Sequence, residues 1–228
     1  MNKVLFNETP PLKEFRDFLM SYYCPKTDYP IHIKHSEVGD DIIYFEIEQY
    51  TDDKNVDMLS HYENLKKENI KEIWTFSKFN IKILNENGVT NCRYIEIIPT
   101  DEYYEKLLSY NPDNTFLYDV SFVGWLASYR RSYILDMLKS KGLRVNIINL
   151  YDDKFGEDRD RIIAKSKILI NIHFNENWKC FEQIRCFPWL KTNKVIVSES
   201  SYDEDDRVIF ADYDKLVDTV IDVLNDKF

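Results

Sequence analysis

Apolar and polar positions in the second half of the chain alternate between two patterns. Short runs of apolar, often β-branched residues predict strands at residues 120–123, 143–150, 168–172, 194–198 and 208–210. Between them, apolar residues spaced three or four positions apart predict helices at residues 128–141, 158–166, 179–190 and 214–225. Strands that alternate with helices indicate an α/β fold, with a mostly parallel sheet covered on both faces.

The first half of the chain has the same alternation in a less regular form. Helices are predicted at residues 11–20, 55–69, 77–87 and 101–108, and strands at residues 41–48, 72–76 and 93–98. Ser77 is placed to cap a helix and Gly88 to end it. Because crossovers between parallel strands are right-handed, the alternation predicts a doubly wound, Rossmann-like topology.

A cluster of turn residues separates the two halves. Residues 110–114 read Tyr-Asn-Pro-Asp-Asn and lie between two periodic stretches. We therefore expect an N-terminal domain over residues 1–112 and a C-terminal domain over residues 113–228.

Composition narrows the class of protein. With 228 residues, 44% of them hydrophobic, the chain is expected to fold around a real core. Its net charge of -10 argues against a broad basic surface, so no nucleic-acid partner is expected. The cysteines at 24, 92, 180 and 186 lack zinc-ligand spacing and are expected to be reduced thiols. No apolar run reaches the ~18 residues of a membrane span, and no signal-peptide pattern occurs, so a soluble, cytoplasmic protein is expected.

The loop after the strand at residues 120–123 has the residue types of a phosphate site. Gly124 lets the backbone turn closely, and Ser128 can cap the helix that follows. Arg130 and Arg131 lie in the first helical turn, where free N–H groups and the helix dipole also favour an anion. The alternative is that both arginines are solvated.

A second group of polar residues follows the strand at residues 168–172. His173 should stand at the carboxyl edge of the sheet, where ligands bind in open parallel sheets. Glu182 and Arg185 lie near the start of the next predicted helix, and a carboxylate there could accept hydrogen bonds from two vicinal hydroxyls. The alternatives are that Glu182 favours the helix dipole and that His173 is a satisfied edge histidine.

A third group lies in the first half. The strand at residues 41–48 ends in Glu48 and is followed by Gln49, and a later segment places Trp74, Ser77 and Asn80 three residues apart. In purely structural terms, Glu48 and Gln49 end a strand and Ser77 caps a helix.

Together these segments resemble the glycosyltransferases of GT-B fold, similar to families 1 and 4, in a short form with a donor-binding C-terminal half. The loop from Gly124 resembles their donor-phosphate loop. The resemblance implies two Rossmann-like halves that face a cleft, and transfer of a sugar from a nucleotide-sugar donor to an acceptor hydroxyl without a metal or another cofactor. One departure is that Glu176 and Glu182 are closer together than the two glutamates of the family pattern.

The resemblance also implies roles for individual residues. Gly124, Arg130 and Arg131 would hold the donor diphosphate, and Glu182 would bind the ribose. Arg185 would bind a phosphate or have a neighbouring role in the donor site. Gln49, Ser77 and Asn80 would line the acceptor side of the cleft. Glu48 and His173 are the candidate bases of an inverting reaction, whereas a retaining reaction could need none. The donor base, the sugar and the acceptor, which could be a glycan, a protein or a small molecule, stay open.

Other interpretations remain. The fold could belong to an inert nucleotide-sugar-binding or scaffold protein, to a nucleotide-sugar epimerase, or to an α/β interaction module, and exposed aromatic residues could support a homodimer. His32 and His35 have no carboxylate at metal-ligand spacing and are expected at a polar strand edge. The acidic residues at 203–206 are expected in a solvated loop.

Overall fold

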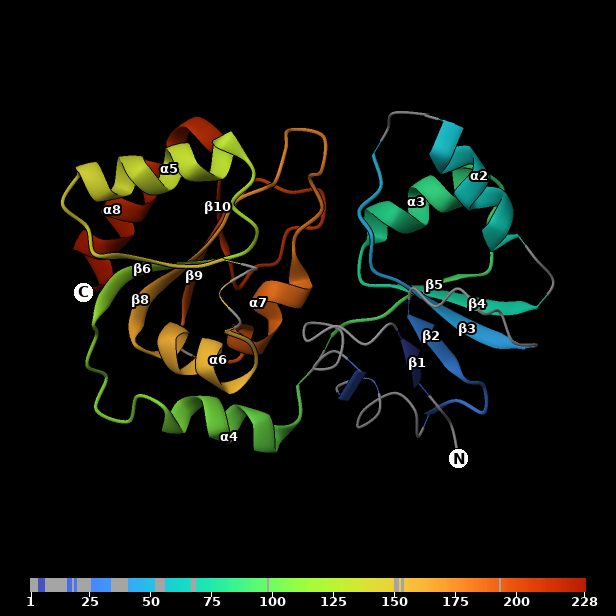
Figure 1. Ribbon diagram of the computed structural model, residues 1–228, viewed down its shortest axis with the longest axis horizontal. Coiled ribbons are helices and arrows are strands. Elements are labelled where there is room, and N and C mark those ends of the chain that lie inside the picture. Colours follow the sequence, from blue (N-terminus) through green and yellow to red (C-terminus); the bar gives the residue numbers. More distant parts are fainter. Residues whose placement is uncertain are drawn as a thin grey trace. The chain divides into compact units, whose positions relative to one another are not determined.

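The computed structural model describes residues 4–6, 16–17, 19, 26–33, 41–51, 56–66, 69–97, 99–149, 152, 154–192 and 194–228. It divides into two units, Met1–Thr100 and Asp101–Phe228, drawn in Figure 1. Most of the helix predicted at residues 11–20 lies outside the described residues, as do Cys24 and His35. Within that helix, Arg16, Asp17 and Leu19 are helical.

The first unit contains a parallel sheet whose strands follow the order of the chain. The strands are β1 (Val4–Phe6), β2 (Ile31–Ile33), β3 (Ile42–Glu46), β4 (Ile70–Thr75) and β5 (Cys92–Tyr94), and they pair in that order. Figure 1 shows α2 (Val56–Leu65) and α3 (Lys78–Glu86) on one face of this sheet. Right-handed crossovers that all step the same way place their helices on one face. The doubly wound topology predicted from the alternation is therefore wrong for the described strands of this unit.

The predicted start and end of helix α3 in the first unit are confirmed. The Ser77 side chain accepts a hydrogen bond from the Asn80 backbone N–H at the start of α3, as a helix cap does. Gly88 follows the helix with a φ of 81°, a conformation that glycine adopts without strain. In the sheet, Ile31, Ile73 and Phe45 are completely buried, as expected of strands in a parallel sheet.

The second unit is doubly wound, as predicted. Its parallel strands are β6 (Tyr118–Val123), β7 (Val145–Ile148), β8 (Ser166–Asn171), β9 (Val195–Glu199) and β10 (Ile209–Ala211), in the order β10-β9-β8-β6-β7. The helices are α4 (Asp101–Ser109), α5 (Tyr129–Ser140), α6 (Glu157–Ala164), α7 (Gln183–Leu190) and α8 (Leu216–Lys227). From β6 the chain steps one way to β7, and from β8 it steps the other way to β9. The topological switch point therefore lies between β6 and β8.

Two helix layers cover this sheet. Figure 1 shows α5 and α8 on one face, with α4, α6 and α7 on the other. Between the sheet and the helices α5 and α8, the hydrophobic core contains Phe122, Leu135, Ile170 and Val220. Under the other layer, it joins Leu107, Ile163, Phe181 and Trp189.

The division between the units falls earlier than the expected boundary at residues 112 and 113. Helix α4 belongs to the second unit, because its Tyr104 and Leu107 are buried against α6 and the sheet. The Tyr103 hydroxyl also donates to the Asp160 carboxylate of α6 at 2.6 Å. The turn residues at 110–114 connect α4 to β6 within one unit, and a turn cluster by itself does not show which contacts cross it.

None of the helices in the described part of the chain combines the length and the apolar character that crossing a bilayer requires.

Two adjacent leucines of α4 provide a test of this boundary. Leu107 is buried and Leu108 is 57% exposed. We expect Leu107→Ala to lower the free energy of unfolding by about 2–5 kcal/mol, because it leaves a cavity in the core of the second unit. Leu108→Ala should change it by no more than about 0.5 kcal/mol. Urea denaturation measures both, and equal losses would contradict the packing of α4.

Candidate functional site

The candidate site lies at the carboxyl edge of the second sheet, at the switch point between β6 and β8. There the loop at residues 124–128 follows β6 and the loop at residues 172–182 follows β8. In open α/β sheets, ligands bind at this edge because the two connections leave in opposite directions and open a crevice. The structure brings six predicted site residues to this edge: Gly124, Arg130, Arg131, His173, Glu182 and Arg185.

Gly124 lets Arg185 approach the backbone. Its φ is 150°, and a Cβ at this position would lie 3.1 Å from Phe122 Cζ and 3.2 Å from Arg185 Nη2. Arg185 Nη1 donates to Asn171 Oδ1 at 2.6 Å, and its Nη2 lies 3.7 Å from Glu182 Oε2. A side chain at residue 124 would therefore crowd the guanidinium and the Phe122 ring, which would have to shift by a few tenths of an ångström.

Helix α7 begins at Gln183, later than the predicted start at residue 179. Glu182 is therefore the residue that precedes the helix, and its side chain does not cap the helix. Pro188 lies within the helix, so one turn lacks a backbone donor. Because α7 begins later than predicted, the loop that follows β8 is longer than predicted.

Arg131 ties the two loops together. It is 3% exposed, and it donates from Nε to the Ile172 carbonyl and from Nη1 to the Trp125 carbonyl, both at 2.9 Å. Burial, with the neighbouring charge of Arg185, lowers the pKa of Arg131 to about 9. The guanidinium still carries its charge at neutral pH, so it adds positive potential beneath the loops while it holds them.

Ser128 is the N-cap residue of α5, but its hydroxyl does not cap the helix as expected. The hydroxyl instead donates to the Phe174 carbonyl of the neighbouring loop. Within the described part of the chain, no side chain caps this end of α5, so its first N–H groups can bind an anion.

An aromatic stack covers Arg131. The rings of Trp125 and Phe174 stack with centroids 5.2 Å apart, and Phe174 and Trp178 stack at 5.6 Å. The Arg131 guanidinium lies 5.3 Å from the Phe174 centroid, a distance that suits a cation–π contact. Both loops therefore have a fixed geometry at the switch point.

Arg130 points toward the ends of β9 and β10. Its guanidinium pairs with Glu199 and lies 3.8 Å from the ring centroid of Tyr213. The Tyr213 hydroxyl in turn donates to the Arg130 carbonyl at 3.0 Å. Burial raises the pKa of Glu199, and the charge of Arg130 opposes this shift. Glu199 was not predicted as a site residue from the sequence, although it ends an apolar strand.

His173 is 1% exposed. Its Nε2 lies 3.2 Å from the Ser200 carbonyl and 3.2 Å from Ser201 Oγ. Since a carbonyl only accepts, Nε2 carries the proton of the neutral ring. Nδ1 is buried without a partner among the described residues. Burial lowers the pKa of His173 to about 4, so the ring is a weak base at neutral pH.

A polar cavity of about 400 Å³ opens beside Arg130. Residues that follow β8, β9 and β10 line it together with α5: Arg130, Glu176, Lys179, Glu199, Ser200, Ser201, Tyr202, Asp212 and Tyr213. It provides hydrogen-bond donors, acceptors and aromatic rings at the same edge as the switch point.

The remaining predicted residues belong to the first unit, at the ends of β3 and β4. Asn80 is completely buried; its Nδ2 donates to the Glu48 carbonyl at 2.7 Å, and its Oδ1 accepts from the Tyr50 N–H at 3.1 Å. Ser77 caps α3. Asn80 thus holds the loop that contains Glu48, which is exposed, and Gln49, which is partly exposed, while Ser77 caps the helix that carries Asn80.

A buried carboxylate that the sequence analysis missed lies at the end of β3. Glu46 Oε2 accepts from the Tyr50 hydroxyl at 2.6 Å and contacts His61 Nε2 at 2.7 Å, while Oε1 accepts from the Glu48 N–H at 2.8 Å. Burial and the nearby Glu46 raise the pKa of Tyr50, so it stays a donor. The side chain of His61, on α2, is 32% exposed. A carboxylate that orients a partly exposed imidazole is an arrangement suited to a general base.

Among the described residues, no three His, Cys, Asp or Glu side chains gather closely enough to hold a metal ion. Cys92 and Cys186 are free thiols, and Cys180 is buried.

Comparison with known proteins finds relatives that are themselves uncharacterized. No family model matches the chain. The uncharacterized protein L140 of Acanthamoeba polyphaga mimivirus is 35% identical over 161 residues, which cover 66% of this chain and 50% of L140. The uncharacterized protein L138 of the same virus is 35% identical over 193 residues, 78% of this chain and 20% of L138. The chain thus spans half or less of the length of these relatives.

A solved structure has a similar fold. The crystal structure of an alpha1,3-fucosyltransferase with GDP superposes with a TM-score of 0.54, over 99% of this chain and 78% of that chain, at 9% identity. The likeness shows a GT-B-like α/β fold, as the sequence resemblance implied. At this identity it shows the fold alone.

The burial of His173 predicts a pH dependence of stability. Its pKa is about 4 in the folded protein, against an ordinary 6.5. As the pH falls from 6.5 toward 4, the unfolded chain binds a proton that the folded chain does not. The free energy of unfolding should therefore fall by about 3 kcal/mol over this window, and the contribution is complete above pH 6.5.

Urea denaturation of the native chain and of His173→Gln at several pH values measures how the free energy of unfolding changes with pH. The difference between the two proteins is the contribution of His173. The variant should lose the steeper decline below pH 6.5. Parallel curves for the two proteins would contradict the buried, neutral ring.

Proposed function

We propose that the chain is a glycosyltransferase, which moves a sugar from a nucleotide-sugar donor to an acceptor hydroxyl without a metal ion. The observation that supports this most is the convergence of Gly124, Arg185 and Glu182 at the switch point of a doubly wound sheet, beside the uncapped start of α5. The GT-B-like fold supports the same reaction class.

The second unit would bind the nucleotide. In the proposal, the diphosphate accepts hydrogen bonds from the first N–H groups of α5 and from Arg185, and the turn at Gly124 lets it approach the backbone. Glu182 accepts hydrogen bonds from the two ribose hydroxyls. Arg130 faces the polar cavity and adds positive charge, while the buried Arg131 positions the loops.

The reaction breaks the bond between the anomeric carbon of the sugar and the diphosphate oxygen. Negative charge accumulates on this oxygen in the transition state, and the fixed guanidinium and N–H dipoles stabilise it there. The acceptor oxygen forms the new bond to the anomeric carbon, and its proton passes to a base.

The first unit would supply that base in an inverting reaction. His173 is a poor candidate, because its pKa is about 4 and its Nε2 proton is directed to a carbonyl. Glu48, predicted from the sequence, has an exposed carboxylate. His61, held by Glu46, is a second candidate, and it also lies near the carboxyl end of β3.

Nucleoside diphosphates should stabilise the folded protein. At a concentration 100-fold above Kd, a ligand adds about 2.7 kcal/mol, which for a chain of this size raises Tm by roughly 5–10 °C. We expect one nucleoside diphosphate of a panel to do so equally with and without Mg²⁺. Glu182→Ala should weaken binding at least about tenfold, since the ribose loses its acceptor.

Glu204→Ala is the matched control, because Glu204 is exposed in the acidic loop and should leave binding unchanged. A panel without any shift at millimolar concentration would rule out the donor site, and the scaffold interpretation would then replace the proposal.

The base can be identified with the donor that this panel selects. Turnover is measured as release of the nucleoside diphosphate. It should fall about 10²–10⁴-fold in one of the two variants Glu48→Gln and His61→Gln, the one that removes the base. The thermal shift by the nucleotide should stay the same in both variants, because neither residue belongs to the second unit. Native turnover in both variants would show that neither Glu48 nor His61 is the base.

A further inference from the structure

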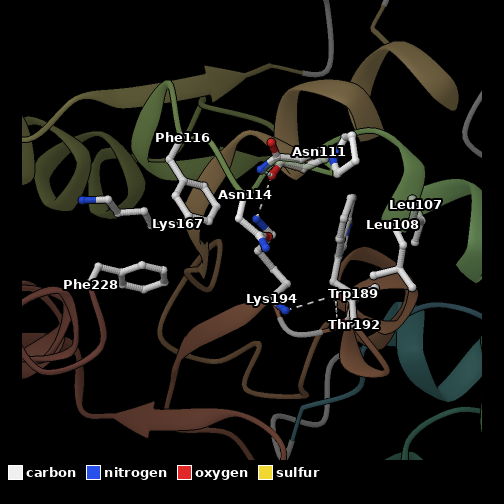
Figure 2. A pocket seen from close by; sticks show the side chains of 12 residues that line it. Leu107, Leu108, Asn111, Asn114, Phe116, Lys167, Trp189, Thr192, Lys194 and Phe228 are labelled. Carbon is white, nitrogen blue, oxygen red and sulfur yellow. Dashed lines mark hydrogen bonds between the residues drawn. The ribbon is translucent and has the colours of Figure 1, made fainter.

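A second cavity, of about 280 Å³, opens at the amino edge of the second unit's sheet, away from the switch point (Figure 2). Its walls come from the segment after α4, from the end of α7, and from residues at the starts of β8 and β9. Neither the predicted site residues nor the proposed nucleotide site line it.

Apolar and aromatic side chains share the walls with polar ones, among them Asn111, Asn114 and Thr192. Phe116 and Phe228 pack edge to face with centroids 5.5 Å apart, and Trp189 and Leu107 also line the cavity. Phe228 is 50% exposed, so part of this apolar surface is open to solvent. An apolar ring of a ligand would remove it from water.

Lys194 places a positive charge among these rings. Its Nζ lies 5.5 Å from the centroid of Phe116 and 5.8 Å from that of Trp189. It donates to the carbonyl of Ala164, at the end of α6, and to that of Ser166, at the start of β8, so two of its three N–H bonds are used. Burial lowers the pKa of Lys194 to about 8.

The two lysines of the cavity differ in their charge partners. Lys167 Nζ lies 3.1 Å from Asp119 Oδ1 and is neutralised by it. Within the described residues, no carboxylate pairs with Lys194. The cavity therefore has one ammonium group whose charge is balanced only by carbonyl dipoles.

Trp189 contributes a second donor. Its side chain is 2% exposed, and its Nε1 has no hydrogen-bond partner among the described residues. A buried indole N–H usually has a partner, because leaving it unsatisfied costs free energy. Two donors with unused capacity thus belong to residues that line this one cavity.

We propose that this cavity binds a small organic anion, a carboxylate attached to an aromatic or branched apolar group. The carboxylate accepts hydrogen bonds from Lys194 Nζ and Trp189 Nε1, and the apolar group packs against Phe116 and Phe228. The volume is near the lower end for ligand pockets, which suits a molecule of roughly one or two rings.

Isothermal titration of the full chain with phenylacetate and indole-3-acetate tests the proposal, with phenylacetamide and indole-3-acetamide as neutral controls of the same shape. Each acid should bind at least about tenfold more tightly than its amide, because only the acid supplies a charged acceptor. Lys194→Met should remove this difference, and Trp189→Phe should weaken binding of the acids. Lys165→Met is the matched control, because Lys165 is an exposed cation that follows α6 and does not line the cavity; it should bind like the native chain.

Three results would overturn the proposal. One is equal binding of acid and amide, another is no binding at millimolar concentration, and the third is tighter binding of the acid that persists in a folded Lys194→Met protein. The comparison of acid with amide uses the native chain, so it holds even if a variant fails to fold. A nucleoside diphosphate should not displace the acid, which separates this site from the proposed donor site.

Discussion

The buried guanidinium of Arg131 is the interaction on which the candidate site depends. Two loops that follow different strands must keep a fixed separation at the switch point, and each presents a carbonyl to this one side chain. Phe174 covers the guanidinium and stacks between two tryptophans. Because a lysine has no planar set of donors, it could not bridge both carbonyls in the same way. The positions of Gly124 and His173 follow from this clamp.

The two units differ in a way that affects where a ligand can bind. In the second unit the connections diverge between β6 and β8, and the polar residues gather at that divergence. In the first unit the described strands follow the chain order, so no comparable divergence opens a crevice. Its polar groups instead stabilise a loop: Asn80 binds the backbone around Glu48, and Glu46 holds His61 and Tyr50. This division is consistent with a nucleotide site in the second unit and acceptor chemistry in the first.

The sequence predicted features that depend on local periodicity. The alternation of strands and helices, the cap at Ser77 and the group of polar residues at the strand ends all come from neighbours along the chain. The sequence did not predict β1, because three residues provide no periodic pattern and their strand depends on pairing with β2. Glu46 and Glu199 were missed for a related reason. Each is buried through contacts with groups distant in sequence, and composition does not distinguish such carboxylates from solvated ones.

The membership of α4 has a consequence for the order of folding during synthesis. A chain emerges from the ribosome N-terminus first, at about 5–20 residues per second. Helix α4 is the first element of its unit to emerge, yet Leu107 and Tyr104 pack against α6, β8 and α7, which are made later. Its apolar face must therefore remain in water, or in contact with a chaperone, until most of the second unit has been translated.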